Sequence, residues 1–234
     1  MIELRNIYFG YKKKIILNNF SLSVTAEPKI IGVFGSPNSG KTVLLKLIAT
    51  LLTPSSGEIF IQNKNVASLS PQELDSIRKN IGMSFQNHAL FDDLTVLENI
   101  LFPVSKDGKI ESYLMERAQE YLKLVGLEMA AHSYPHEISG CIQKRVSVLR
   151  AMIRHPSIML FDDPTSGLDP VLSKHILNTI KLVHEHVGSI SFIVSQKILY
   201  IWEYIHEVIV LKDKKIFHGS KNDISKEHIM DALE

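Results

Sequence analysis

The sequence predicts an α/β fold in which a mostly parallel β-sheet carries helices on both faces, and three observations support this prediction. Short apolar runs alternate with segments of helical spacing along most of the chain. Two of these runs, 81–85 and 157–161, are mostly apolar, which is typical of strands buried on both faces. A third run, 29–34, leads into a glycine-bounded loop and then a helical segment, the order found in a strand–loop–helix unit.

The first part of the chain begins with strands. Residues 1–9 and 16–24 alternate between apolar and polar side chains, which predicts an antiparallel pair. Ser70 and Glu73 form a capping box with Pro71 between them, so a helix should begin there. The other elements predicted up to residue 85 are a strand over 29–34, a helix that ends near Leu52, a strand over 58–62, a helix that ends near Lys79, and a strand over 81–85.

The segment from about 87 to 145 contains no clear strand pattern and is predicted to be a helical insertion. Thr95 and Glu98 form a second capping box, and helical spacing continues to about residue 126 with a break near 103–108. The remaining predicted elements are a helix over 142–154, a strand over 157–161, a helix over 171–187, a strand over 189–195, a hairpin of strands 208–212 and 215–218, and a closing helix.

Composition and charge restrict the kind of partner. The 234 residues include 26 basic and 25 acidic side chains, so a net charge of +1 provides no general basic surface and no nucleic-acid partner is expected. The run Lys12–Lys14 is predicted to be a solvated hairpin turn. A single cysteine, Cys141, excludes an internal disulfide and is typical of a reducing compartment. Because no segment is long and apolar enough to span a membrane, we expect a cytoplasmic protein or the cytoplasmic part of a larger assembly.

Residues 35–42 spell G-x-x-x-x-G-K-T, the phosphate-binding loop of nucleotide-binding proteins. In such a loop successive backbone N–H groups surround a polyphosphate, and the following helix directs its positive end toward it. Lys41 is expected to reach the β- and γ-phosphates, and the Thr42 hydroxyl to hold Mg²⁺. Asn38 tolerates left-handed backbone angles, so it can occupy a loop position that glycine could also take.

A second group of polar residues follows the apolar strand near residue 160. Ile158–Phe161 is followed by two carboxylates, Asp162 and Asp163. A strand buried on both faces would deliver Asp162 to its C-terminal end beside the phosphate-binding loop, where it can hold Mg²⁺, usually through water. Asp163 is then placed to polarise an attacking water molecule.

Further segments resemble the motifs of one family. Ile138–Ile142 is similar to the signature L-S-G-G-Q/M of ATP-binding-cassette (ABC) ATPases, and Asp162–Pro170 is similar to the Walker B and D-loop run of the same family. Gln86 matches the family's Q-loop glutamine, and Tyr11 matches the aromatic residue that stacks on adenine. The ordered set of motifs covers essentially the whole chain, which is therefore identified by resemblance as a member of the ABC ATPases.

The resemblance implies a P-loop NTPase fold of the ABC type, with a mostly parallel core sheet, an antiparallel β subdomain and a helical subdomain. Residues 1–234 would form one domain: about 1–86 and 146–234 make the RecA-like core, and about 87–145 make the helical signature subdomain. The cofactors would be ATP and Mg²⁺. The implied catalytic residues are Lys41, Gln86, Asp163 and Gln196; the implied nucleotide-binding residues are Tyr11, Gly35, Ser36, Pro37, Asn38, Ser39, Gly40, Lys41, Thr42, Val43, Ser139 and Gly140; and the implied metal ligands are Thr42, Gln86 and Asp162.

The resemblance also implies protein partners. Two cassettes, as a homodimer or with a second ABC subunit, would face head to tail so that each ATP lies between one loop 35–42 and the partner's Ser139–Gly140. A groove near Gln86 and the segment 87–100 would receive an integral membrane permease. The chain would then be peripheral on the cytoplasmic face of the inner membrane.

Within the family, residues 78–91 and the segments that follow, 94–100 and Pro103, resemble the Mla-type lipid-transport ATPase. That system moves phospholipid between bacterial membranes with a permease and an MCE-domain lipid-binding protein. Two alternatives stay open: a regulatory or structural subunit that binds ATP with little hydrolysis, and the ATPase of another permease, for lipoprotein release or nutrient import.

Three positions depart from the family's pattern, and all belong to the hydrolytic apparatus. Asp163 stands where the family has glutamate, and its carboxylate is one methylene shorter. Gln196 stands where the family has the H-loop histidine, and its amide can donate a hydrogen bond but cannot carry a proton at neutral pH. Cys141 and Ile142 replace the second glycine and the fifth residue of the signature. We therefore expect intact nucleotide binding with slow hydrolysis.

Overall fold

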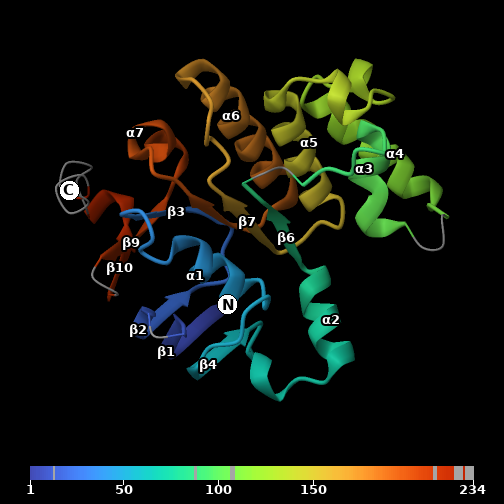
Figure 1. The fold of residues 1–234 in the computed structure, drawn as a ribbon. Coiled ribbons are helices and arrows are strands. Elements are labelled where there is room, and N and C mark those ends of the chain that lie inside the picture. The colour runs from blue at the N-terminus through green and yellow to red at the C-terminus, as the bar shows by residue number, and fades with distance from the viewer. Residues whose placement is uncertain (13, 87–88, 106–108, 213–214, 224–228, 230–234) are drawn as a thin grey trace.

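A six-stranded, mostly parallel sheet forms the centre of the molecule (Figure 1). The structure, a computed structural model, describes residues 1–12, 14–86, 89–105, 109–212, 215–223 and 229. Every neighbouring pair in this sheet is parallel except β10 and β9, which confirms the predicted α/β fold. In spatial order its strands are β10 (Lys215–Ser220), β9 (Glu207–Lys212), β3 (Lys29–Gly35), β8 (Ile190–Val194), β7 (Ile158–Asp162) and β6 (Ile81–Ser84).

A separate antiparallel sheet packs beside α1 (Figure 1). It consists of β2 (Lys14–Val24), β1 (Ile2–Tyr11), β4 (Ser56–Ile61) and the short β5 (Lys64–Asn65), in that order. The predicted pairing of β1 with β2 is confirmed, and Ile2 lies opposite Val24. The short strand β5 was not predicted, because two residues are too few to show a period.

The helices fall close to their predicted positions. Both capping boxes are present, at Ser70 with Glu73 and at Thr95 with Glu98. The predicted closing helix and the turn of the last hairpin lie mostly outside the described residues. The α-helices are α1 (Lys41–Ile48), α2 (Pro71–Lys79), α3 (Val96–Leu101), α4 (Ser112–Leu124), α5 (Gly140–Met152), α6 (Pro170–Val187) and α7 (Ile198–Ile201), and single 3₁₀ turns cover Val66–Ser68, Phe102–Val104, Glu128–Ala130, Pro135–Glu137, Trp202–Tyr204 and Lys221–Asp223.

Two helix boundaries differ from the prediction for reasons visible in the backbone. Helix α1 ends at Ile48 rather than near Leu52, because Thr50 adopts a left-handed conformation (φ 57°) and the N–H groups of Leu51 and Leu52 turn back to Lys46 O. Helix α5 starts at Gly140 rather than Ile142, because the Ser139 side chain accepts a hydrogen bond from the Ile142 N–H and acts as the N-cap.

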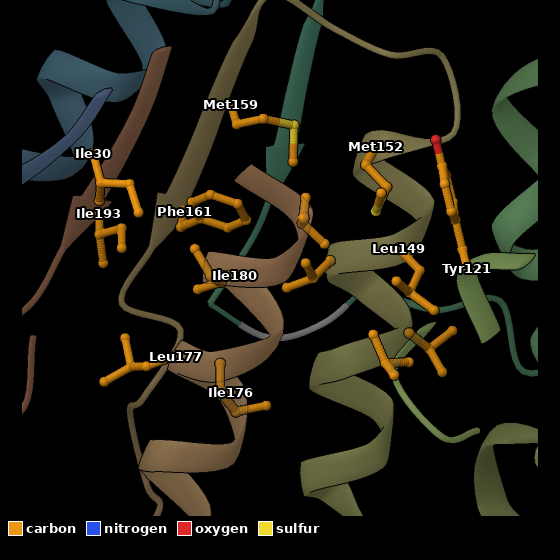
Figure 2. Packing of buried hydrophobic residues seen from close by; sticks show 14 of the residues in the cluster. Ile30, Tyr121, Leu149, Met152, Met159, Phe161, Ile176, Leu177, Ile180 and Ile193 are labelled. Atoms are coloured by element: carbon orange, nitrogen blue, oxygen red, sulfur yellow. The ribbon is translucent and has the colours of Figure 1, made fainter. Parts of the chain in front are cut away.

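The parallel sheet is buried on both faces, and alternate residues of each strand enter different cores. In β7, Met159 and Phe161 pack toward α5 and α6, as Figure 2 shows beside Ile180. Ile158 and Leu160 of the same strand pack toward α1 and the antiparallel sheet. This explains why the run appears continuously apolar, as predicted. Helices α5, α6 and α7 thus cover one face, with α3 and α4 packed on the outer side of α5, and α1 with the antiparallel sheet covers the other face (Figure 1).

This packing brings the polar ends of the strands together. Strands β3 and β7 flank β8 and run parallel to it, so the loop after Gly35 and the carboxylates after Phe161 emerge at one edge of the sheet. Among the described helices, none is both long and apolar enough to cross a lipid bilayer. The division into a core and a helical unit over 87–145 stays a prediction.

Candidate nucleotide-binding site

A cavity of about 450 Å³ opens at this edge of the sheet, between the phosphate-binding loop and the start of β2. Lys14, Ile16 and Val194 also line it and were not predicted. Gly35 and Ser36 belong to the loop without lining the cavity, and Ser139 and Gly140 lie away from it on α5. The sequence-predicted residues that line it are Tyr11, Pro37, Asn38, Ser39, Gly40, Lys41, Thr42, Val43, Gln86, Asp162, Asp163 and Gln196.

The backbone of the loop is held in a conformation that depends on Asn38 and its glycines. Asn38 is left-handed (φ 63°), as its residue type allows, and Gly40 has φ 103°. Gly35 has no room for a side chain, because a Cβ there would lie 2.7 Å from the backbone oxygen of Leu211 and 2.3 Å from Ser39 Oγ. The conformation of the loop is therefore set by close packing of Gly35 against Ser39 and Leu211.

Lys41 lies inside this loop and is only 7% exposed. Its Nζ donates hydrogen bonds to Gly35 O at 2.7 Å and to Ser36 O at 2.9 Å. Burial lowers the pKa of Lys41, and the nearby charges of Asp163 and Asp162 partly oppose that shift. Among the described residues, the hydrogen-bond partners of this ammonium group are carbonyl oxygens, and it can exchange them for charged phosphate oxygens that bind it more strongly.

Thr42 and Asp162 meet at the floor of the cavity. The Thr42 hydroxyl donates to Asp162 Oδ1 at 2.9 Å, and the carboxylate is 6% exposed. Burial raises the pKa of Asp162, while the Thr42 hydrogen bond and the charges of Lys46 and Lys41 act in the opposite direction. These are hard oxygen donors, and Mg²⁺ commonly takes one or two protein oxygens and completes its shell with water and substrate phosphates, so the residues present fit that ion.

Asp163 adopts a left-handed backbone conformation (φ 46°) directly after β7 and is half-buried at the cavity. Burial raises the pKa of its carboxyl, and the charge of Lys144 is the largest influence that lowers it. Gln196 is exposed, lines the same cavity and follows β8, the neighbour of β7 in the sheet. Gln86 donates from Nε2 to Ser166 Oγ at 3.3 Å, so its amide is directed at the turn after β7.

Tyr11 and the signature residues Ser139 and Gly140 are all exposed, but their surroundings differ. The Tyr11 ring is 52% exposed and lies perpendicular to the Phe9 ring, with ring centroids 5.1 Å apart, so much of it is accessible to a stacking partner. Gly140, by contrast, begins α5 in open space: a Cβ there would meet no atom within 4 Å. Cys141 beside it is partly buried, and burial raises the pKa of its thiol. Within one chain, Ser139 and Gly140 are not part of the cavity.

A second hollow, of about 540 Å³, lies between α2, β6 and α5. The exposed rings of Phe85, Phe91 and Phe102 line it, and Phe91 packs on Phe102 with centroids 4.3 Å apart. Arg78 and Arg154 add positive charge to the same wall. An apolar hollow with a basic wall is suited to bind another protein segment.

Comparison with known proteins identifies the family. A family model described as ABC transporter matches residues 17–166. The chain is 35% identical over 219 residues to a methionine import ATP-binding protein of Carboxydothermus hydrogenoformans, covering 92% of this chain and 65% of that protein. It is 34% identical over 228 residues to the intermembrane phospholipid transport system ATP-binding protein of Haemophilus influenzae, covering 96% of this chain and 85% of that protein. The chain belongs to the ABC transporter ATP-binding family.

Solved structures agree with this assignment. The dimeric ATP-binding cassette MJ0796 in a post-hydrolysis state, bound to ADP and phosphate, superposes with a TM-score of 0.81 at 31% identity and covers 94% of this chain and 99% of that one. A part of the ABC transporter complex cbiONQ, cbiO1 of Clostridium perfringens, superposes with a TM-score of 0.86 at 23% identity over 98% of this chain and 92% of that one, which concerns the fold alone. The chain spans only about 65% of the length of the methionine import relative.

Proposed function

We propose that this chain is the ATP-binding subunit of an ABC transporter and that the cavity at the end of β3 and β7 receives the nucleotide. The observation that carries the proposal is the contact of Thr42 with Asp162 at 2.9 Å, next to the buried Lys41. A hydroxyl and an ammonium group from the start of α1 converge there with a carboxylate from the end of β7, which is the donor set that a magnesium nucleotide needs.

Each predicted residue then has a task. Lys41 would exchange its two carbonyl partners for phosphate oxygens, while backbone N–H groups of the loop bind the remaining oxygens. Thr42 and Asp162 would hold Mg²⁺, which supplies charge neutralisation at the phosphates, and Gln86 would join them once released from Ser166. Tyr11, whose ring is exposed, would stack on the adenine.

Hydrolysis requires a base and a γ-phosphate contact. Asp163 would orient and polarise the attacking water, and Gln196 would donate a hydrogen bond to the γ-phosphate from the end of the neighbouring strand β8. Because Asp163 has a short side chain and Gln196 cannot hold a proton, we propose that the rate is low. A subunit that binds ATP with very little hydrolysis is the alternative, and it corresponds to the same two residues lowering the hydrolysis rate almost to zero.

A second cassette would complete the site. The open space around Gly140 and the cap residue Ser139 are available to a partner's nucleotide, and the related cassette MJ0796 is dimeric. We propose a head-to-tail dimer, either of two copies or with another ABC subunit, in which residues 87–145 form the signature subdomain over the partner's cavity.

The hollow lined by Phe85, Phe91 and Phe102 is the proposed docking surface for an integral membrane permease. Docking there would hold the chain at the cytoplasmic face of the inner membrane. Charge changes at Leu90 and Phe91 should therefore move the folded chain into the soluble fraction. Unchanged recovery of the folded double variant with membranes would count against this surface.

Two cargoes are proposed. Phospholipid, carried with an MCE-domain partner, is favoured by the similarity of residues 78–103 to the Mla-type ATPase and by the phospholipid transport relative, which aligns over 96% of this chain. Methionine or another small nutrient is favoured by the equally similar methionine import relatives. Purification of the chain with its membrane partners, followed by mass spectrometry of bound lipids and proteins, separates the two. Co-purified phospholipid and an MCE protein would support the first, whereas a small permease without them would support the second.

ATP binding itself is tested without the transporter. Mg-ATP should raise the melting temperature of the isolated chain, and the Lys41→Ala variant should lose that response. Equal stabilisation of both proteins would contradict the proposed site.

A further inference from the structure

A lysine outside the phosphate-binding loop also lines the nucleotide cavity, and it has no task in the proposed function. Lys14 is the first residue of β2 and is exposed at the wall of the cavity. Among the described residues that line the cavity, Lys14 and Lys41 are the cationic side chains, and Asp162 and Asp163 are the anionic ones. Without Lys14, a single ammonium group would face both the two carboxylates and the phosphates of a nucleotide.

The hairpin of β1 and β2 places Lys14 beside Tyr11. The two residues are register partners in the antiparallel pair, so their side chains leave the same face of the sheet. A Cβ at Gly10 would lie 2.5 Å from Lys14 O, so the absence of a side chain at Gly10 lets the two strands approach closely here. Lys14 is therefore held next to the ring that is proposed to stack on the adenine.

Strand β2 also contacts the phosphate-binding loop. Ile16 lines the same cavity, and a Cβ at Gly40 of the loop would lie 2.9 Å from Ile16 Cγ2. Alternate residues of a strand share a face and are about 6.6 Å apart along it, so Lys14 follows Ile16 on this face, one strand repeat further from the loop. The flexible four-carbon stem of a lysine can cross a gap of that size.

The order of these groups along the cavity indicates which part of a nucleotide Lys14 meets. Tyr11 marks the proposed base end of the site, and Lys41 marks the end that receives the β- and γ-phosphates. Lys14 lies beside Tyr11 and one strand repeat from the loop, so its ammonium group faces the part of the phosphate chain nearest the sugar. An ammonium group donates hydrogen bonds and carries a full positive charge, so its strongest partner on a nucleotide is a phosphate oxygen.

From this geometry we propose that Lys14 is a nucleotide-binding residue that contacts the α-phosphate, the phosphate that is attached to the sugar. This inference rests on the proposed function of the cavity. Because ATP and ADP share the α-phosphate, Lys14 holds substrate and product alike. A contact that does not change during the reaction affects how tightly the nucleotide binds but not how fast it is hydrolysed.

The test is isothermal titration calorimetry of the full chain with Mg-ATP and with Mg-ADP. Lys14→Gln should raise the Kd of both nucleotides by about 3- to 10-fold, since an exposed contact between opposite charges is worth less than a buried one. Lys14→Arg keeps the charge and should retain most of the affinity. The matched control is Lys12→Gln, which makes the same charge change in the same hairpin at an exposed residue outside the cavity lining, and it should bind like wild type.

Two further measurements separate a phosphate contact from other roles. Salt screens exposed charges, so the difference in Kd between wild type and Lys14→Gln should shrink between about 0.05 and 0.5 M NaCl. In the assembled transporter, Lys14→Gln should raise KM for ATP while kcat changes little.

An unchanged Kd in Lys14→Gln, with wild type binding Mg-ATP and Lys41→Ala not binding it, would overturn this inference and leave the proposed function intact. A loss confined to ATP would place the ammonium group at the γ-phosphate, and a loss that salt does not alter would place it at the base, so either result would overturn the α-phosphate contact. An equal loss in Lys12→Gln would reduce the effect to general charge. If wild type binds no nucleotide, the proposed function fails and this inference fails with it.

Discussion

The phosphate-binding loop and the turn after β7 face the same cavity but differ in what holds them and in how closely they follow the family pattern. The loop 35–42 is shaped by its own chain: Gly35 is enclosed by Ser39 and Leu211, and Lys41 is bound to loop carbonyls. The turn 163–168 is held by lysines from elsewhere and carries the short carboxylate of Asp163. We propose that the residues that hold a nucleotide are complete, whereas those that activate water are altered.

This difference indicates that nucleotide binding and nucleotide hydrolysis depend on separate structural features within one fold. Binding depends on donors whose positions are set by backbone geometry, and such positions tolerate little change. Hydrolysis depends on the reach of one carboxylate, and a displacement of about 1 Å can cost on the order of 100-fold in rate. A chain can therefore keep nucleotide binding while its rate of hydrolysis falls.

The largest expected effect concerns nucleotide binding by the loop 35–42. Nucleotide at about 100 times its Kd stabilises a protein by about 2.7 kcal/mol, which corresponds to roughly 5–10 °C in a chain of this size. Lys41→Ala should remove that shift, because the loop loses the ammonium group proposed to bind the phosphates. Differential scanning fluorimetry with and without Mg-ATP measures this. Lys181→Ala, an exposed residue of α6, serves as the control and should keep the full shift.

The next largest effect concerns the rate of ATP hydrolysis. Asp163→Glu combined with Gln196→His should raise kcat of the assembled complex by about 10- to 100-fold, since a well-placed base is worth about 100- to 10,000-fold. KM should change less, because Lys41, Thr42 and Asp162 are untouched. The two substitutions should be non-additive, as both act on the same phosphate and water. If the wild-type complex already turns over briskly and the double variant is no faster, Asp163 and Gln196 form a competent site of their own.

Substitutions at two glycines test this comparison further. Gly35→Ala should lower the free energy of unfolding by about 1–3 kcal/mol, because the new methyl group meets backbone atoms of Leu211. Gly140→Ala should leave stability within about 1 kcal/mol, since the site is open and helical. The same Gly140→Ala change should weaken ATP-dependent dimerisation, measured by sedimentation. Unaltered dimerisation would argue against a partner closing on Gly140.

The smallest expected effect concerns Asp162 in the absence of nucleotide. Burial raises its pKa in the folded state, so the ionised carboxylate opposes folding once the pH exceeds the ordinary pKa of aspartate. Asp162→Asn should therefore increase the melting temperature at neutral pH. The gain should disappear in acid, where wild-type Asp162 is protonated in both states. A gain that is constant across pH would point to packing instead of charge.

Much of this arrangement was predictable because short-range patterns determine it. The capping boxes at Ser70 and Thr95, the two-faced burial of β7 and the left-handed Asn38 all follow from residue type and spacing. The end of α1 was not predictable, because the left-handed turn at Thr50 falls on a residue that has no special tolerance for it.

Other features depend on contacts between distant segments. Lys14 was predicted to lie in a solvated turn, yet it lines the cavity because β2 begins beside the loop. Lys144 follows the signature segment and gives no local sign that its side chain reaches Ser166, 22 residues later. Such contacts arise from the packing of α5 against the sheet, which a single sequence does not reveal.

The lifetime of an ATP-bound dimer tests the central claim most directly. Our proposal of complete binding residues and altered hydrolytic residues predicts that the wild-type chain in Mg-ATP forms a dimer that persists in analytical ultracentrifugation, with ATP still bound after many minutes. The Asp163→Glu, Gln196→His variant should form the same dimer and lose it as ATP is hydrolysed. A wild-type dimer that separates at once with release of ADP, or a chain that binds no ATP, would contradict the account.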